Sequence, residues 1–466
     1  MSNALLHSVL GLINKLVMVV AIATLTACGG GSSSDPAPSA QASAEALRAN
    51  RITGPGLIAD QPAVVNTTVA GTQTLSAMGA RSDGGYAVAW VSQGDASAAP
   101  ALYLQHYDAA GAMVGPETLV QIDIASLHQP AIAVMSDGGV LVAYSLSSPV
   151  STTEPWIVRS TLYTRRFDAS GAAAGGETEV HSFVQNLLFA QIIYSFTDLA
   201  IVTWPDGRYL VGWAYVESSY LGSIPTFSFR LFDALGAPLG DAFGAIRGEV
   251  GTSFKLTAIP DGGFVIATFH RLMGQQYVIF GVHSSTGESA SIGTYLDPVL
   301  GLPASQTVLL PLVDGRLALW SSNQGGPYLQ MFDRAGTAVG SPTPGSSLPS
   351  FASALSDGGY ATFTRAGSIE PFAVQRFSSA GSPLGDSFQV QVEPAAIGTL
   401  PMMTSPLDGG LVLGWTGTST AGGLDVYAQH FEEAQTKQAR MRDCRTQAQG
   451  LQGAERRQFM RQCMNR

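Results

Sequence analysis

The sequence is poor in cysteine and in charged residues. It has three cysteines among 466 residues, and none lies between positions 29 and 443, so that long middle segment must be stabilised by packing rather than by disulfide bonds. Charged residues make up 12% of the chain and hydrophobic residues 45%, a composition that excludes an intrinsically disordered chain. The 53 glycines and 25 prolines are typical of a protein with many turns.

The sequence also lacks the short motifs that carry catalysis. No Gly-x-Ser-x-Gly, His-Glu-x-x-His or Gly-Lys-Thr signature occurs in it. The seven histidines do not have the spacing of metal ligands; they are His7, His106, His128, His181, His270, His283 and His430. We therefore predict no catalytic residues, no metal site and no cofactor. A glycosidase needs only two carboxylates, so a motif search does not exclude that activity.

Residues 1–27 are typical of a secretory signal, because Lys15 supplies a positive charge and the apolar run after it is too short to span a bilayer. The run ends in Leu-Thr-Ala-Cys at 25–28, which resembles the lipobox of bacterial lipoproteins. The resemblance implies cleavage before Cys28 and a lipid on its sulfur that anchors the chain in a membrane. Gly29, rather than Asp, follows the cysteine, which implies the outer membrane, with the protein facing the periplasm or the cell surface. The alternative is an ordinary secretory signal in which Cys28 is incidental.

Composition divides the rest of the chain into three parts. Residues 28–49 are rich in Gly, Ser, Pro and Ala and predict a flexible tether. From 28 to 433 there are 15 Lys/Arg and 32 Asp/Glu, whereas the tail, 434–466, has eight Lys/Arg and two Asp/Glu. The acidic body argues against nucleic acid as a partner. The basic tail is either a solvated helix or a contact with anionic lipid or a phosphate-bearing ligand.

An internal repeat covers residues 50–433. An Asp-Gly pair followed by a short strand occurs seven times, with 43 to 69 residues between successive aspartates. The aspartates are Asp83, Asp137, Asp206, Asp261, Asp314, Asp357 and Asp408. A second element, an aromatic residue followed by Asp-x-x-Gly or a near version, begins at Tyr107, Phe167, Phe232, Phe332 and Phe377. The fourth repeat reads Val-His-Ser-Ser-Thr-Gly at 282–287, and the seventh stops after Phe431 and two glutamates.

Each repeat predicts four antiparallel strands. Asp-Gly between two apolar runs forms a hairpin turn, because both residues tolerate positive φ, and the aromatic–Asp–x–x–Gly element turns a third strand into a fourth. In the second repeat we expect strands at about 130–135, 139–144, 161–167 and 177–182. One Asp per turn does not supply the six or more oxygens of a calcium site, so we assign the aspartates to the turns.

Seven such units predict an all-β fold, a monomeric seven-bladed β-propeller of four-stranded blades over residues 50–433. The repeat resembles one found in large bacterial surface proteins, a likeness that concerns architecture and carries no function. Because the seventh repeat lacks a fourth strand, we expect residues 52–65 to complete the last blade. The apolar stretch 184–204 contains polar residues, so we interpret it as a connection and a buried first strand rather than a membrane span. Two packed β-sandwiches are the alternative fold.

The tail has a helical composition. Its Cys444, the Leu-Gln-Gly at 451–453, Phe459 with Met460, and Cys463 resemble the repeat of the PsiF family, small exported proteins linked to phosphate starvation. The resemblance implies no mechanism. We expect 434–466 to form a short helical hairpin, stapled by a Cys444–Cys463 disulfide because the exported compartment is oxidising.

These features favour a non-enzymatic envelope lipoprotein whose propeller binds a protein or a glycan. Trp156, Tyr220 and Tyr328 fall in the variable segments between second and third strands, where an aromatic side chain can stack on a sugar; ordinary loop packing is the other interpretation. The alternative function is a carbohydrate-active enzyme, a glycosidase or lyase, with a carboxylate pair at the propeller channel.

Overall fold

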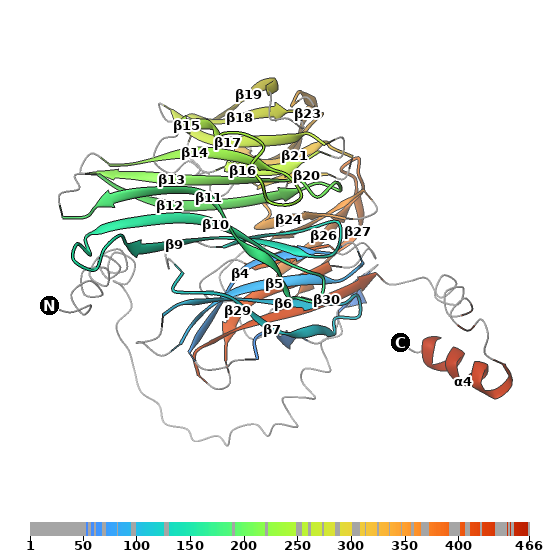
Figure 1. Ribbon diagram of the computed structural model, residues 1–466. Helices are drawn as coiled ribbons and strands as arrows, with labels where there is room; N and C mark the ends of the chain where they lie inside the picture. The colour runs from blue at the N-terminus through green and yellow to red at the C-terminus, as the bar shows by residue number, and fades with distance from the viewer. Residues whose placement is uncertain are drawn as a thin grey trace, which may run out of the picture.

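The computed structural model is built almost entirely of antiparallel β-sheet (Figure 1). It describes residues 53–54, 57–59, 62–67, 71–81, 83–94, 99–124, 130–188, 192–219, 222–247, 254–259, 262–272, 275–284, 289–300, 308–312, 314–323, 326–334, 336–345, 347–355, 358–364, 372–390, 401–405, 411–419, 422–433, 445, 448 and 452–464. The predicted all-β class is therefore confirmed.

Five sheets have four strands each, and within each sheet the strands are neighbours in chain order. The second repeat forms β8 (Ala131–Val134), β9 (Val140–Pro149), β10 (Ile157–Phe167) and β11 (Ala173–Asn186). The third forms β12 (Ile192–Thr203), β13 (Tyr209–Ser219), β14 (Gly222–Phe232) and β15 (Phe243–Arg247). The fourth forms β16 (Phe254–Ala258), β17 (Phe264–Leu272), β18 (Gln275–His283) and β19 (Ser289–Leu300).

The fifth and sixth repeats follow the same plan. The fifth forms β20 (Val308–Pro311), β21 (Leu317–Asn323), β22 (Gly326–Phe332) and β23 (Ala338–Pro344). The sixth forms β24 (Phe351–Ala354), β25 (Tyr360–Thr364), β26 (Phe372–Phe377) and β27 (Pro383–Val390). The described part of the tail includes α4 (Gly453–Met464); the helical hairpin over 434–466 stays a prediction.

A ten-stranded sheet joins the two ends of the body. The first repeat supplies β4 (Thr72–Ala80), β5 (Tyr86–Gln93), β6 (Ala101–Tyr107) and β7 (Met113–Ile122). The seventh supplies β28 (Met402–Thr404), β29 (Leu411–Thr418) and β30 (Leu424–Glu433). The short strands β1 (Thr53–Gly54), β2 (Leu57–Ala59) and β3 (Ala63–Val64) complete it. One parallel bridge, Leu424 opposite Thr72, connects the first and seventh repeats.

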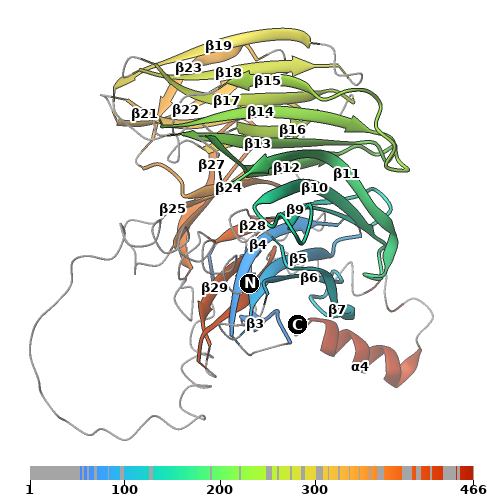
Figure 2. The same ribbon diagram turned by 60° about the vertical axis from the view of Figure 1, so that its left-hand side comes forward.

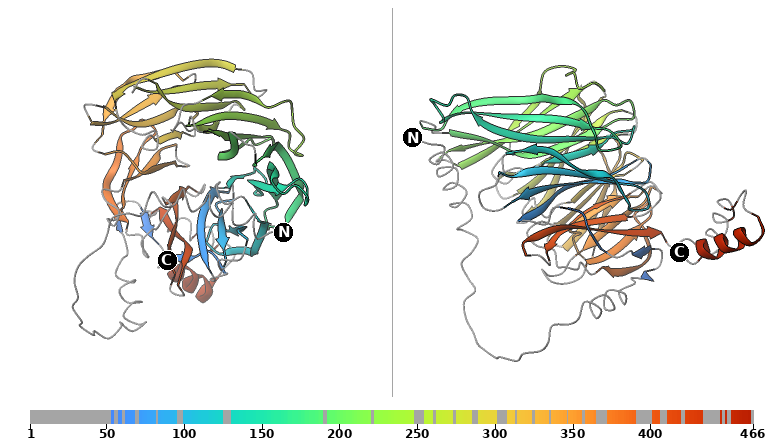
Figure 3. Two further views of the ribbon diagram at one scale, coloured as in Figure 1. Left: turned by 90° about the vertical axis from the view of Figure 1, so that its left-hand side faces the viewer. Right: turned by 60° about the horizontal axis from the view of Figure 1, so that its bottom comes forward.

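The sheets follow one another around a common centre in chain order (Figures 2 and 3). The first strand of each repeat contacts the first strand of the next, from β4 through β8, β12, β16, β20 and β24 to β28, and β28 contacts β4. The alternative of two packed sandwiches is therefore wrong, because no pair of sheets encloses the core alone.

The turns divide the body into two faces. Hairpins from first to second strand and from third to fourth strand lie at one end of the sheets, which we name the turn face; the connections from second to third strand lie at the opposite end, the loop face. In the second repeat the predicted strands overlap β8 to β11, and β9, β10 and β11 extend further toward the loop face than the sequence indicated.

The N-terminal segment pairs with the last strand, as predicted. β2 lies antiparallel to β30 with Leu57 opposite Glu433, and β3 continues the pairing with Val64 opposite Tyr427. Stretch 184–204 also matches its prediction, because it contains the end of β11, a connection and β12.

Alternating side chains of the second strands explain why the repeats pack in a row. In β5 the large residues Tyr86, Val88 and Trp90 belong to the hydrophobic cluster shared with the seventh repeat. Ala87 and Ala89 point the other way, into the cluster shared with the second repeat. In a strand, successive side chains alternate between the two faces. In β5 the bulky side chains therefore pack against the seventh repeat, and the small side chains pack against the second repeat.

The small position is sterically required in β13. Gly212 occupies it, and a Cβ there would lie 2.9 Å from Phe229 and from Phe254 of the next repeat. Seven hydrophobic clusters occur among the described residues, one between each pair of successive repeats and one between the seventh and the first.

The two repeat motifs meet through ring stacking. The aromatic residue that opens the second strand stacks on the aromatic residue that closes the third: Tyr86 on Tyr107 at 4.6 Å and Tyr209 on Phe232 at 4.9 Å between ring centroids. In the fourth repeat His283 takes this place and stacks on Phe264 at 4.8 Å. His283 is thus the structural equivalent of the missing aromatic residue.

Asn66 provides a test of the terminal pairing. Its Nδ2 donates to Asp425 Oδ1 at 2.8 Å, and its Oδ1 accepts from the Val426 amide at 2.8 Å, so one buried side chain ties the N-terminal segment to β30. We expect Asn66→Ala to lower the free energy of unfolding by about 2 kcal/mol, because two buried polar groups lose their partners. Urea denaturation measures this. Thr67→Ala, at an exposed neighbour, should cost less than half as much; equal costs would contradict the assignment.

Candidate functional site

The recurrent aspartates of the turn face act within their own turns. Asp83 Oδ1 accepts a hydrogen bond from the Gly85 amide at 3.0 Å, and Asp137 Oδ1 accepts one from Gly139 at the same distance. Asp108 Oδ1 accepts from the amides of Ala110 and Ala112 in the second kind of turn. Gly84 sits between these groups at a φ of 87°, a conformation that glycine adopts without strain. These contacts support the turn role predicted from sequence.

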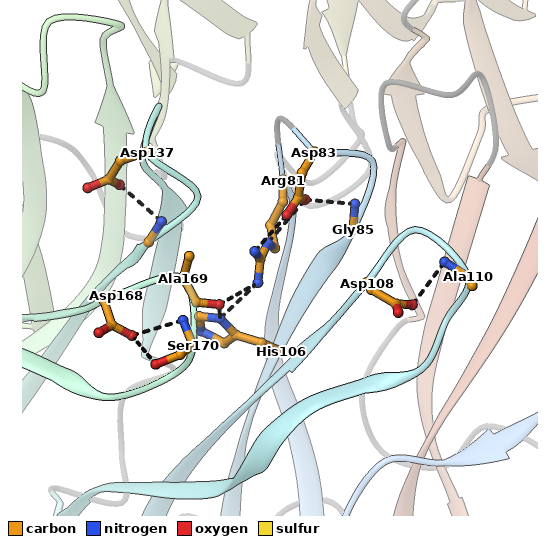
Figure 4. Close-up of polar contacts among 11 residues, drawn as sticks. Arg81, Asp83, Gly85, His106, Asp108, Ala110, Asp137, Asp168, Ala169 and Ser170 are labelled. Atoms are coloured by element: carbon orange, nitrogen blue, oxygen red, sulfur yellow. Dashed lines mark hydrogen bonds and ion pairs between the residues drawn. The ribbon is translucent and has the colours of Figure 1, made fainter.

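An arginine links the first repeat to the second through one of these turns (Figure 4). Arg81 follows β4 and is only 4% exposed. Its guanidinium pairs with both carboxylate oxygens of Asp83, at 3.2 and 2.7 Å. Its Nη1 also donates to the backbone carbonyl of Ala169, at 3.0 Å, in the turn of the next repeat. Asp83 thus holds the arginine in the orientation that joins two sheets.

The same clasp recurs with its arginine at other sequence positions. Arg166, at the end of β10, pairs with Asp137 and donates to the carbonyl of Ala234. Arg316, next to β21, pairs with Asp314 and donates to the carbonyl of Ser379 at 2.5 Å. Ala169, Ala234 and Ser379 occupy the same place in their turns, the third residue of the element that begins with the aromatic residue. We call these three contacts the inter-repeat clasps; each consists of a turn aspartate, an arginine and a carbonyl of the next repeat.

The carboxyls of the clasps are favoured in their charged form. Burial opposes ionisation of Asp83, but hydrogen bonds from Gly85 and from Arg81 outweigh it, so the pKa of Asp83 lies below its usual value of 3.8. The pKa values of Asp137 and Asp314 are lowered in the same way by their arginines and turn amides. Ionised aspartates therefore contribute to the cohesion of the turn face.

His106 is a buried member of the first clasp. Its Nδ1 lies 3.1 Å from Arg81 Nη1 and 3.3 Å from the Ala169 carbonyl. Burial lowers its pKa, and the positive charge of Arg81 adds to this effect. The pKa of His181 is also lowered by burial, where its ring stacks on Trp213 at 5.3 Å. Both rings are thus neutral near pH 7 and belong to the packing of the body.

The innermost strands carry two charged residues. In the bounds of β4, β8, β12, β16, β20, β24 and β28 the charged side chains are Asp198 of β12 and Lys255 of β16. These two strands are neighbours, and a β-bulge between Phe196 and Leu199 accommodates Asp198. Burial raises the pKa of Asp198, and the charge of Lys255 opposes the rise. Asp198 and Lys255 are therefore the only charged residues within the described first strands.

The loop face is longest at the second and third repeats. Third strands end at equivalent positions on the turn face, yet β10 and β14 have 11 residues whereas β6 and β22 have seven. The extra four residues extend about 13 Å toward the loop face. Figure 1 shows the ends of β12 and β13 projecting beyond the other sheets.

Three exposed apolar side chains lie at the loop-face end of the second repeat. Val150, Val184 and Leu188 are 50–58% exposed. The Val150 amide donates to Ile157 and the Leu187 amide to Trp156, both at 2.8 Å, so the hairpin loop and the end of β11 are held together. We name the set Val150, Trp156, Val184 and Leu188 the loop-face tip.

The predicted aromatic candidates have different outcomes. Trp156 lies in the turn between β9 and β10 and is half-buried within the loop-face tip. The expectation for Tyr328 was wrong: it lies inside β22 and is 4% exposed, because β21 and β22 extend almost to their connecting turn. Tyr220 lies outside the described residues.

Other predicted sites also lie outside the described part of the chain. Cys28 and Cys444 are not described, nor is the side chain of Cys463, so the lipid anchor and the disulfide remain predictions. Within the described residues, no group of three or more His, Cys, Asp or Glu is arranged to hold a metal ion, and no helix is long and apolar enough to cross a membrane.

The arginines of the clasps were missed by the sequence analysis. They come from before the Asp-Gly turn, from the end of the third strand, and from the start of the second strand, so they form no repeated motif. The groups that accept hydrogen bonds from these arginines are backbone carbonyls, which any residue type supplies, so no sequence pattern identifies them. Asp198 and Lys255 had a visible signal, a charge within an otherwise apolar first strand.

No protein-family model matches the chain, and no curated protein matches it. Solved structures with similar folds include the polysaccharide lyase Uly1, with 11% identity over 80% of this chain and 92% of that one and a TM-score of 0.47. The WD40 domain of Neurospora crassa Pan2 has 10% identity over 81% and 96%, with a TM-score of 0.43. The β-propeller domain of the Trilobed protease from Pyrococcus furiosus has 10% identity over 79% and 97%, with a TM-score of 0.40. Similarity of this degree identifies neither a substrate nor a partner.

Removing one clasp should destabilise the body. We expect Arg81→Ala to lower the free energy of unfolding by about 2 kcal/mol, because the Ala169 carbonyl, His106 and Asp83 lose a charged donor. Chemical denaturation measures the loss. Arg159→Ala removes an exposed arginine of β10 and should change stability by less than about 0.5 kcal/mol. An equally small effect of Arg81→Ala would show that the clasp does not hold the sheets together.

We expect the free energy of unfolding to decrease in two stages as the pH is lowered. Because the pKa values of His106 and His181 are lower in the folded protein than the value of 6.5 in the unfolded chain, their neutral forms stabilise the fold above pH 6.5. This stabilisation is lost as the pH falls below 6.5 and the imidazoles become protonated. The pKa values of Asp83, Asp137 and Asp314 are also lowered in the folded protein, so a second loss of stability follows below pH 3.8, where these carboxylates become protonated. Thermal unfolding from pH 7.5 to 3 measures both. His106→Gln should reduce the first stage, and an unchanged profile would exclude His106 as its source.

Proposed function

We propose that this chain is an outer-membrane lipoprotein, anchored by a lipid on Cys28, whose body is a closed seven-bladed propeller that serves as a binding module rather than an enzyme. Three observations support the closed propeller: seven repeats, contacts of first strands that return from β28 to β4, and a hydrophobic cluster between the seventh and first repeats. The lipobox-like residues 25–28 support the anchor.

The loop-face tip is the observation that carries the binding role. Exposed apolar side chains are unremarkable singly, but a projecting group of them marks an interaction site. The group lies on paired strands, with Arg159 directly opposite Val184, so a cationic side chain borders the apolar patch. A projecting, apolar and partly aromatic surface fits a protein partner better than a glycan, which binds through many polar contacts in a concave site.

The enzymatic alternative requires a second carboxylate. Hydrolysis of glycosides by the usual route uses two carboxyl groups about 5–10 Å apart. Asp198 is the single acidic residue within the bounds of the first strands, and its charged neighbour is a lysine. The described first strands therefore favour binding over hydrolysis, and an enzyme would have to draw its second carboxylate from elsewhere.

Substitution at the tip tests the proposal. We expect Leu188→Asp to abolish capture of a specific partner from solubilised envelope, because a charge would be buried in an apolar interface. Leu235→Asp is the matched control, since Leu235 is 94% exposed and lies in a turn of the turn face. Affinity of the identified partner, measured by titration, should fall at least about tenfold for the first variant and stay unchanged for the second. Equal affinities, or capture of glycan alone, would contradict a protein-binding tip.

A further inference from the structure

One face of the second repeat points toward the first repeat. In β9 the side chains of Val142 and Tyr144 point that way, because both belong to the hydrophobic cluster that the two repeats share. Side chains two residues apart lie on the same side of a strand, and so do residues directly opposite one another on neighbouring strands. Ser148 of β9, Arg159 of β10 and Val184 of β11 lie opposite one another and therefore form a row on this face.

The first repeat does not extend far enough to cover this row. Counted from the aromatic residue that closes each third strand, Ala101 at the start of β6 is equivalent to Thr161 of β10. Thr161 is 3% exposed, whereas Arg159, one row further toward the loop face, is exposed. Val184 in the row of Arg159 and Val150 in the row beyond it are each about half exposed. We name the residues of these two rows the uncovered face; they are Ser148, Val150, Ile157, Arg159, Val184 and Asn186.

Arg159 is the cation of the uncovered face, and no described residue pairs with it. Seven other arginines of the body donate to a carboxylate or to a backbone carbonyl; they are Arg81, Arg165, Arg166, Arg208, Arg230, Arg316 and Arg334. Arg376 is buried. Arg159 is exposed and donates to no group of the described residues. It therefore adds little to the stability of the fold, while arginine is among the residues that contribute most to protein interfaces.

The size of the uncovered face limits what it can hold. Three strands about 4.8 Å apart and two rows about 7 Å apart give an area of about 10 by 7 Å. A stable contact between two folded proteins buries about 800 Å² on each partner, which is far more. In an extended segment, alternate side chains are also about 7 Å apart, so successive ones can lie on the two rows. The uncovered face therefore fits a short extended segment better than a folded domain or a second copy of this chain.

We propose that the uncovered face binds an extended segment of a partner protein, which places an acidic side chain on Arg159 and an apolar one, two residues away, on Val150 and Ile157. The proposal rests on the proposed function, because it specifies the partner of the loop-face tip. A carboxylate accepts two parallel hydrogen bonds from a guanidinium, and the apolar side chains around the pair exclude water from it. Residues 28–433 carry 15 Lys/Arg and 32 Asp/Glu, so an acidic segment is repelled elsewhere on the body and its binding is specific to this place.

A library of random heptapeptides displayed on phage tests this proposal. The mature chain from residue 28, carrying Cys28→Ser to prevent lipidation, is the bait. We expect enrichment of peptides with Asp or Glu two positions from an apolar residue. Arg159→Glu should abolish this enrichment and select Lys or Arg in place of the acidic residue, because the charge of the site is reversed. Arg159→Gln should lower the affinity of the best selected peptide at least about tenfold, measured by fluorescence titration.

Arg456→Glu is the matched control, because it makes the same change of charge at an exposed position of α4 and should leave the selection unchanged. Enrichment of peptides without acidic residues, or of the same peptides by the Arg159→Glu variant, would overturn the proposal. No enrichment would also overturn it, and self-association that Arg159→Glu abolishes would then identify a second copy of this chain as the occupant. Urea denaturation of each variant verifies that the fold is retained.

Capture from solubilised envelope separates this proposal from the function on which it rests. If Leu188→Asp abolishes the capture of a partner and Arg159→Glu leaves it unchanged, the loop-face tip binds protein and the role of Arg159 is wrong. If neither variant changes what is captured, the binding role of the loop-face tip is wrong as well.

Discussion

Every sheet of this protein has two apolar faces, and neither can be buried inside its own repeat. Tyr86, Val88 and Trp90 pack against the preceding repeat, while Ala87 and Ala89 pack against the following one. The hydrophobic effect therefore requires a neighbour on both sides of each sheet. A linear row would leave one apolar face exposed at each end. The cluster that joins Leu75 and Trp90 to Val412 and Val426 removes both exposed faces at once.

Pairing of the two ends of the body follows from the same requirement. The seventh repeat supplies only three strands, so the outer edge of β30 would be open to pairing with another chain. Residues 57–59 and 63–64 cover that edge, and Asn66 fixes the register through Asp425 and Val426. In a body without cysteine, this backbone pairing does the work that a disulfide does in many exported proteins. It also places the start of β2 beside the end of β30 on the turn face.

The sequence predicted what depends on local signals and missed what depends on contacts between repeats. Asp-Gly hairpins and the N-terminal strand have short-range signatures with which the structure agrees, and five of the repeats each form a four-stranded sheet. The inter-repeat clasps have none, since Arg81, Arg166 and Arg316 come from different positions and bond to main-chain carbonyls. Tyr328 was misplaced because the length of a strand at its loop end is set by packing against the adjacent sheets. His283 shows the converse, a motif lost in sequence but retained in structure.

The turn face and the loop face differ in how strongly the structure restricts their amino-acid sequence. On the turn face, many of the described residues are constrained by positive φ, by a side-chain to backbone hydrogen bond or by a clasp. On the loop face, strands end where packing ends, and the second, third and fourth strands of the repeats range from five residues in β15 and β25 to 14 in β11. Variation in strand and loop length that does not disturb the core is available there. The proposed binding role on the loop face thus follows from one arrangement, in which the turns of the described repeats point the same way.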